Sequence, residues 1–93
     1  MAVHADPVEI RRFASMLKAF NNDLSSNTRV LQGQFQNLGQ TWNDPQHQKF
    51  AQEFQQLIRI LQQFVQSSEH EIPLLLKMAE HLEQAQSVYG RGR

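Results

Sequence analysis

Apolar residues recur at a seven-residue spacing along the first part of the chain. Leucine or isoleucine occupies every seventh position from residue 10 to residue 38, and Phe13 and Phe20 lie one column away. Because residues three, four and seven apart share one face of an α-helix, this pattern predicts an amphipathic helix. Asp6 suits the N-cap and Pro7 the first helical position, with Glu9 at the capping-box place. The first helix is therefore predicted over about 7–40.

A second stripe of the same period predicts another long helix. Asp44 and Pro45 repeat the cap-then-proline start, and glycines at 90 and 92 mark the end, which gives a helix over about 45–87 and a flexible tail over 88–93. Pro73 lies inside this helix. Since an interior proline removes one backbone hydrogen bond, a kink or a local break is expected between about 69 and 73. Its outward-facing position argues against a third independent helix.

Turn-forming residues cluster between the two stripes, which predicts a turn over 41–44. A short connection makes two long helices antiparallel neighbours. The fold class expected for the single domain 1–93 is therefore all-α, an antiparallel two-helix hairpin. The apolar residues assigned to its core, or to the core of a dimer, are Ile10, Phe13, Leu17, Phe20, Leu24, Leu31, Phe35, Leu38, Phe50, Phe54, Leu57, Leu61, Phe64, Leu75, Met78 and Leu82.

The apolar face is wider than the contact line of one hairpin needs. Residues such as Met16, Val30, Ile60 and Leu74 add a third column beside the two that a seam uses. The excess predicts that two hairpins dimerise into a four-helix bundle. Lys and Arg number 9 and Asp and Glu number 9, so no strongly one-signed face is expected. This favours a homodimer slightly over pairing with a homologous chain.

Composition and motifs argue against a catalytic, metal-binding or nucleic-acid-binding function. The zero net charge argues against nucleic-acid binding. The chain has no cysteine, which excludes disulfides, thiolate zinc sites and cysteine nucleophiles. No glutamate has a histidine three residues on, as carboxylate-bridged metal bundles require. We expect no catalytic residue, cofactor or metal, histidines in contact with solvent, and Glu71 on the inner seam. With neither an apolar leader nor a membrane-length apolar run, the protein is expected to be cytosolic or exported without a cleaved leader.

Trp42-Asn43-Asp44, midway along two amphipathic helices in a chain of just under one hundred residues, resembles the Trp-x-Gly turn of the WXG100 family. The resemblance covers nearly the whole chain and implies a small helical-hairpin protein associated with type VII secretion. It also implies that the protein pairs with a homologous chain and is recognised by a secretion ATPase. Asp44 stands where the family has glycine, and it can serve as the N-cap of the second helix.

The family also carries a C-terminal export signal, Tyr-x-x-x-Asp or Tyr-x-x-x-Glu. Tyr89 stands in the corresponding region, but Arg93 occupies the position of the acid, so only half of the signal is present. Two functions are left open by the sequence. One is a secreted substrate or co-secreted partner, and the other is an intracellular structural or adaptor bundle that docks the helices of another protein.

Overall fold

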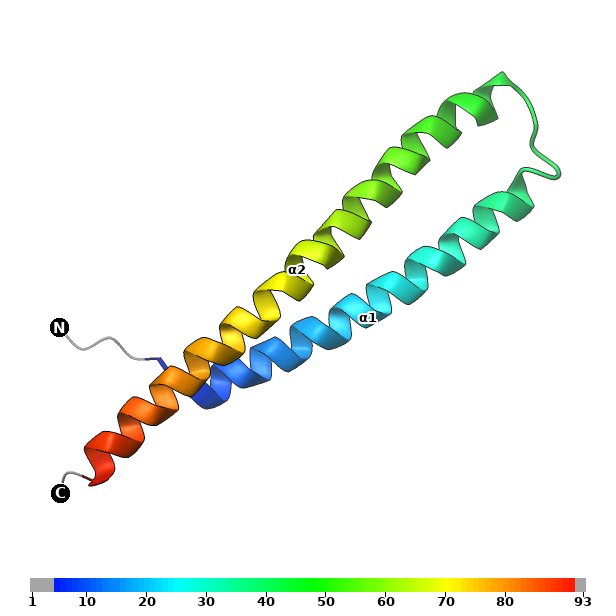
Figure 1. Ribbon diagram of the computed structural model, residues 1–93. Coiled ribbons are helices and arrows are strands. Elements are labelled where there is room, and N and C mark those ends of the chain that lie inside the picture. The colour runs from blue at the N-terminus through cyan, green and yellow to red at the C-terminus, as the bar shows by residue number, and fades with distance from the viewer. Residues whose placement is uncertain (1–4, 92–93) are drawn as a thin grey trace.

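The protein is an antiparallel hairpin of two long α-helices (Figure 1). The computed structural model describes the backbone of residues 5–91 and the side chains of residues 5–87. Helix α1 spans Pro7–Leu38 and helix α2 spans Pro45–Arg91, and together they form a rod of 74 × 22 × 17 Å. The predicted all-α hairpin is confirmed.

Helix α1 begins where the capping residues predict. Asp6 has an extended backbone, and its Oδ1 accepts a hydrogen bond of 2.9 Å from the N–H of Val8, with Pro7 in the first turn. The helix ends at Leu38, two residues before the predicted end. The backbone N–H groups of the next four residues donate to carbonyls at the end of the helix, which closes it without a left-handed glycine.

Helix α2 begins at Pro45, as predicted, but it is longer than predicted. It passes through Pro73 without interruption and continues to Arg91, so the alternative of a local break near residue 73 is wrong, and residues 88–91 are helical instead of forming a tail. Pro73 is exposed, while Ile72 and Leu75 on either side of it are half-buried. Packing on both sides of the proline therefore holds the helix where one backbone hydrogen bond is missing. Residues 92 and 93 of the predicted tail lie outside the described residues.

Small and polar side chains share the seam between the helices with larger apolar ones. The buried residues of α1 follow a seven-residue repeat, and those of α2 lie on the facing stripe. They are Pro7, Ala14, Asn21 and Thr28 in α1, and Phe54, Ile58, Ser68 and Ala79 in α2. Ala14 and Ala79 lie at the end near the termini, whereas Phe35 and Phe54 pack 4.6 Å apart near the turn. In Figure 1 the helices accordingly separate toward the turn.

A buried amide fixes the register of the two helices. Asn21 is only 1% exposed, and its Nδ2 donates to Ser68 Oγ at 2.8 Å and to Glu69 Oε2 at 2.9 Å. A buried polar group in the seam favours the one register in which its partners face it. The sequence analysis missed Asn21, Thr28 and Ser68 as seam residues, because small and polar side chains do not contribute to a hydrophobic pattern.

The predicted core divides into two sets of different exposure. Half of its members are buried or half-buried between α1 and α2: Ile10, Leu17, Leu24, Phe35, Phe54, Leu61, Leu75 and Leu82. The other half are exposed in the single chain: Phe13, Phe20, Leu31, Leu38, Phe50, Leu57, Phe64 and Met78. One hairpin therefore covers only part of the stripe.

Replacing Asn21 with alanine removes the donor shared by Ser68 and Glu69. We expect Asn21→Ala to lower the free energy of unfolding by roughly 1–3 kcal/mol, because buried polar partners lose their hydrogen bonds. Urea unfolding followed by circular dichroism measures the change. Exposed Asn22 is the matched control, since Asn22→Ala changes helix propensity equally. Equal effects of the two replacements would contradict a role for Asn21 in the seam.

Candidate functional site

An aromatic cluster closes the turn end of the hairpin. The half-buried indole of Trp42 meets the ring of His47 edge-on, with centroids 5.0 Å apart, and lies 6.3 Å from the ring of Phe50. The His47 ring in turn stacks on Phe35 at 5.1 Å with an interplanar angle of 6°. Trp42 thus belongs to a packed cluster that joins the connection to both helices.

The three motif residues have distinct positions at this end. The N–H of Trp42 donates to the carbonyl of Leu38 at 2.8 Å and so completes the last turn after α1. Asp44 Oδ1 accepts from the N–H of His47 at 2.9 Å, which makes Asp44 the N-cap of α2, as the sequence analysis proposed. Asn43 is exposed between them. An aspartate cap therefore starts α2 where the family motif has glycine.

His47 departs from the expectation that the histidines contact solvent. Its ring is half-buried, and Nε2 is buried without a hydrogen-bond partner among the described residues. His70 and His81 are exposed, as expected. His47 lies seven residues before Phe54, on the column that packs against α1, and this spacing was a signal of its burial.

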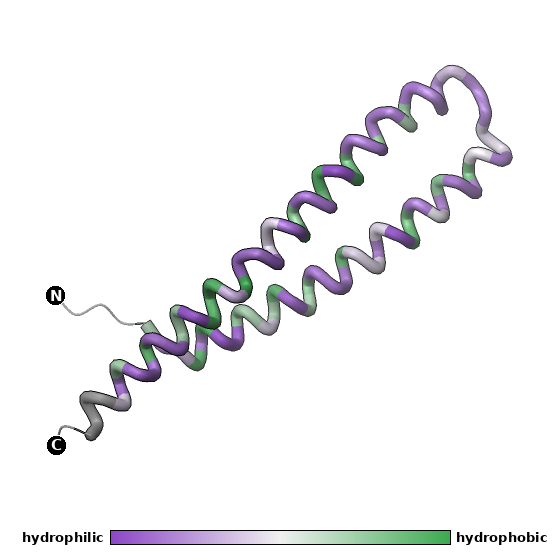
Figure 2. Tube along the Cα trace, viewed as in Figure 1, coloured by the Kyte–Doolittle hydropathy of each residue, from purple (hydrophilic) through white to green (hydrophobic). Residues whose placement is uncertain are grey.

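One side of the hairpin is an apolar face. The innermost seam column consists of residues 7, 14, 21, 28 and 35 of α1, and 51, 58, 65, 72 and 79 of α2. The apolar face comprises, in both helices, the positions one before and two after each residue of this column. It also includes the exposed leucines of α1 at the edge of the seam. Its large apolar members are Phe13, Met16, Phe20, Val30, Leu31, Leu38, Phe50, Leu57, Ile60, Phe64, Leu74 and Met78, each exposed by 42% or more. Phe20 and Phe64 meet edge-on at 6.0 Å, so the two helices form one surface here. Figure 2 shows hydrophobic residues recurring along the length of both helices.

Glu71 lies on the apolar face and not on the inner seam, which corrects the sequence prediction. It is exposed, one residue before half-buried Ile72 and seven residues from both Phe64 and Met78. Ile72, and not Glu71, lies in the column of α2 that packs against α1. The prediction failed because the columns of a wide stripe are indistinguishable until the second helix shows which of them it covers.

The opposite side of the hairpin is a polar face, on which ion pairs link the helices. Arg11 Nη2 lies 2.7 Å from Glu83 Oε1, and Lys18 Nζ contacts Glu69 Oε1. The hydrogen bonds from Lys18 and from Asn21 hold the pKa of Glu69 below its ordinary value. The hydrogen bond from Arg11 lowers the pKa of Glu83 in the same way and raises the pKa of Arg11.

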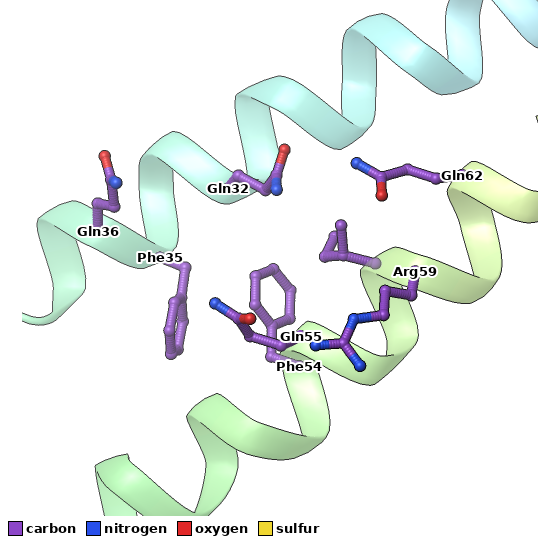
Figure 3. A pocket seen from close by; sticks show the side chains of 8 residues that line it. Gln32, Phe35, Gln36, Phe54, Gln55, Arg59 and Gln62 are labelled. Carbon is purple, nitrogen blue, oxygen red and sulfur yellow. The ribbon is translucent and has the colours of Figure 1, made fainter.

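A crevice of about 250 Å³ opens near the turn end, between α1 and α2 (Figure 3). Phe35 and Phe54 lie between the helices, and the amides of several glutamines and the guanidinium of Arg59 surround them. This lining offers hydrogen bonds but neither a nucleophile nor a carboxylate.

Among the described residues, no group of three or more His, Asp or Glu side chains could hold a metal ion. Neither α1 nor α2, as far as it is described, combines the length and the apolar character of a membrane span.

Tyr89, the half of the export signal that the chain retains, lies in the last turns of α2, and its side chain is outside the described residues. Since Arg11 in the second turn of α1 pairs with Glu83, the end of α2 extends beyond the start of α1, as Figure 1 shows. Arg93 also lies outside the described residues. The turn motif and Tyr89 are thus at opposite ends of the hairpin.

The model of a family described as WXG100, proteins of 100 residues with WXG, matches residues 2–89 of the chain. No curated protein and no solved structure matches the chain.

Replacing Asp44 tests the cap of α2. We expect Asp44→Ala to lower the free energy of unfolding by about 0.5–2 kcal/mol, and Asp44→Gly to lower it by only a few tenths, because glycine is also accepted at an N-cap. Thermal and urea unfolding measure both values. Asn43→Ala is the control, since Asn43 is exposed and makes no side-chain hydrogen bond in the described structure. An Asp44→Ala protein as stable as the control would refute the cap.

Replacing Glu69 tests the ion pair with Lys18. A carboxyl group whose pKa is lowered on folding stabilises the fold above its unfolded value, near 4.5, and this contribution is lost as the pH falls through the lower folded value. We therefore expect Glu69→Gln to destabilise the hairpin at neutral pH and to match the wild-type protein in strong acid. Urea unfolding across pH measures the difference. The same profile for Glu80→Gln, an exposed acid of α2 without an ion pair in the described structure, would assign the effect to general acid titration.

Proposed function

The chain belongs to the WXG100 family, and from this membership we propose that it is a non-enzymatic protein of a type VII secretion system, either a substrate or a co-secreted partner. It acts by protein–protein contact. The hairpin pairs with a second hairpin, its own copy or a homologous chain, to form a four-helix bundle. The apolar face is the observation that carries this proposal.

The apolar face is larger than the exposed apolar patches that are usual on monomeric proteins. Each of its twelve large apolar side chains keeps 42% or more of its surface accessible to solvent, and they extend along both helices. Burial of apolar surface contributes roughly 25 cal/mol per Å², and contiguous exposed patches of this kind mark interaction sites. A four-helix bundle covers such a face with the same type of surface from another hairpin.

Pairing would also create a composite surface for export. Antiparallel packing of two hairpins brings the turn of one chain near the helix ends of the other. Trp42 and Asp44 hold the turn in a fixed conformation, and α2 projects beyond α1 at the other end. A secretion ATPase can then recognise the junction only when the bundle has formed. With Arg93 in place of an acid, the partner would supply the complete signal.

The alternative function is an intracellular structural or adaptor protein whose apolar face docks helices of a different protein. The incomplete signal at Tyr89 favours this alternative. The two functions differ in the location of the protein, so its presence in culture supernatant rather than in the cell lysate distinguishes them.

Replacing Trp42 tests the recognition of the turn. We expect Trp42→Ala to reduce export severalfold while the helical content persists, because the indole packs at the end of the hairpin and outside its seam. Quantitative immunoblotting of supernatant and lysate measures export, and circular dichroism measures helicity.

The control for this experiment is Asn43→Ala, in the same connection, which should leave export unchanged. Normal export of the Trp42→Ala protein would remove the turn from the mechanism. Loss of both helicity and export would assign Trp42 to folding instead.

A further inference from the structure

The charged residues on the apolar face are of one sign. The positions one before and two after the innermost seam column carry Asp23 in α1 and Glu53 and Glu71 in α2, all exposed. Glu9 in α1 is at an equivalent position. These positions hold no lysine or arginine in either helix, and their remaining titratable residue is His81.

One of the four acids forms an ion pair among the residues that the structure describes, and the other three do not. Glu9 pairs with Arg12 at 2.7 Å. Asp23, Glu53 and Glu71 make no ion pair within the part of the chain that the structure describes.

The bases of the chain lie elsewhere on the surface. Arg11 and Lys18 pair with acids on the polar face, on the other side of the hairpin. Arg12, Lys49 and Lys77 occupy the outermost column, which points away from the partner helix. The premise that no face is one-signed, on which a homodimer was favoured, therefore fails: the chain is neutral, but its apolar face is acidic.

The apolar face of a second copy offers these acids no lysine or arginine. Two identical apolar faces bring together acids, apolar groups and uncharged polar side chains, with His81 as their remaining titratable residue, whether the hairpins pack parallel or antiparallel. Carboxylates that lose water on pairing without a cation oppose association, whereas opposite charges across an interface select the partner. This effect is greatest for Glu71, because this residue lies between Phe64 and Met78 in the same column of the apolar face.

We propose that the apolar face is covered by a different helical hairpin, one whose own apolar face carries lysine or arginine opposite Asp23, Glu53 and Glu71, rather than by a second copy of this chain. This inference rests on the proposed pairing function and names the chemistry of the partner. The hydrophobic contact supplies affinity, and the three carboxylates determine which chain is accepted.

A charge-reversed copy of the chain serves as the probe for such a partner. It carries Asp23→Lys, Glu53→Lys and Glu71→Lys and is otherwise identical. We expect an equimolar mixture of wild-type and reversed chains to form a 1:1 complex that is roughly tenfold or more tighter than either homodimer, since several weak ion pairs together supply about that factor. Analytical ultracentrifugation, with one chain fluorescently labelled, measures the three dissociation constants.

A second copy with the same net charge tests whether the position of the charges matters. Each reversal adds two positive charges and each Gln→Lys adds one, so replacing six exposed glutamines outside the apolar face gives the matched charge. They are Gln36, Gln52, Gln56, Gln63, Gln66 and Gln84. This control copy should bind the wild-type chain no more tightly than the wild-type chain binds itself. Equal binding by the reversed and control copies would overturn the proposal.

The results separate this inference from the proposed function. A wild-type homodimer as tight as the mixed complex would overturn the acidic selection of a partner, while pairing through the apolar face would stand. Phe64→Lys in the wild-type chain should abolish the mixed complex, whereas Gln62→Lys on the polar face should not. If no pair of chains associates, or if association survives Phe64→Lys, the apolar face is not the pairing surface, and both proposals fail.

Discussion

The close approach of two helices along a narrow seam is the constraint on which the rest of the structure depends. Ala14 and Ala79 are almost completely buried, and a buried amide and two hydroxyl side chains share the seam with them. Small side chains permit close contact between helices but occupy little of the apolar stripe. Many of the larger aromatic and aliphatic side chains consequently lie to one side, where a single chain cannot cover them.

The rotation of each helix about its own axis decides which residues lie on each side of the hairpin. Placing Asn21 opposite Ser68 brings Lys18 to Glu69 on one side and Phe20 to Phe64 on the other. On the polar side, Arg11 pairs with Glu83 and Lys18 with Glu69 across the helices. The apolar side is incomplete in two respects: its hydrophobic surface is exposed, and Asp23, Glu53 and Glu71 make no ion pair within the described residues. The proposed partner would meet both deficiencies, which connects the packing of the hairpin to its proposed role.

The turn connects this arrangement to recognition. Trp42 is anchored by backbone and ring contacts between α1 and α2, and Asp44 starts the second helix, so the motif forms one rigid end of the rod. A surface assembled from this end and the helix ends of a partner exists only in the paired state. In the proposed function, pairing and recognition are thereby linked through geometry.

The sequence by itself determined the helices, their starting points and the hairpin. Seven-residue periodicity and local caps such as Asp6 and Asp44 are short-range properties, readable without knowledge of the partner helix, and the family motif was readable for the same reason. Even Pro73 was placed correctly on the outside, although its neighbours on the seam kept the helix continuous there.

Only the tertiary structure decided which column of the wide stripe faces inward. The sequence analysis favoured the large leucines and phenylalanines and placed Glu71 among them, whereas the seam took Ala14, Asn21 and Ser68. It also expected His47 in solvent, but the turn places the ring over Phe35. The physical reason is that burial between two helices depends on their rotation and separation, and these are set by all the contacts along both helices at once.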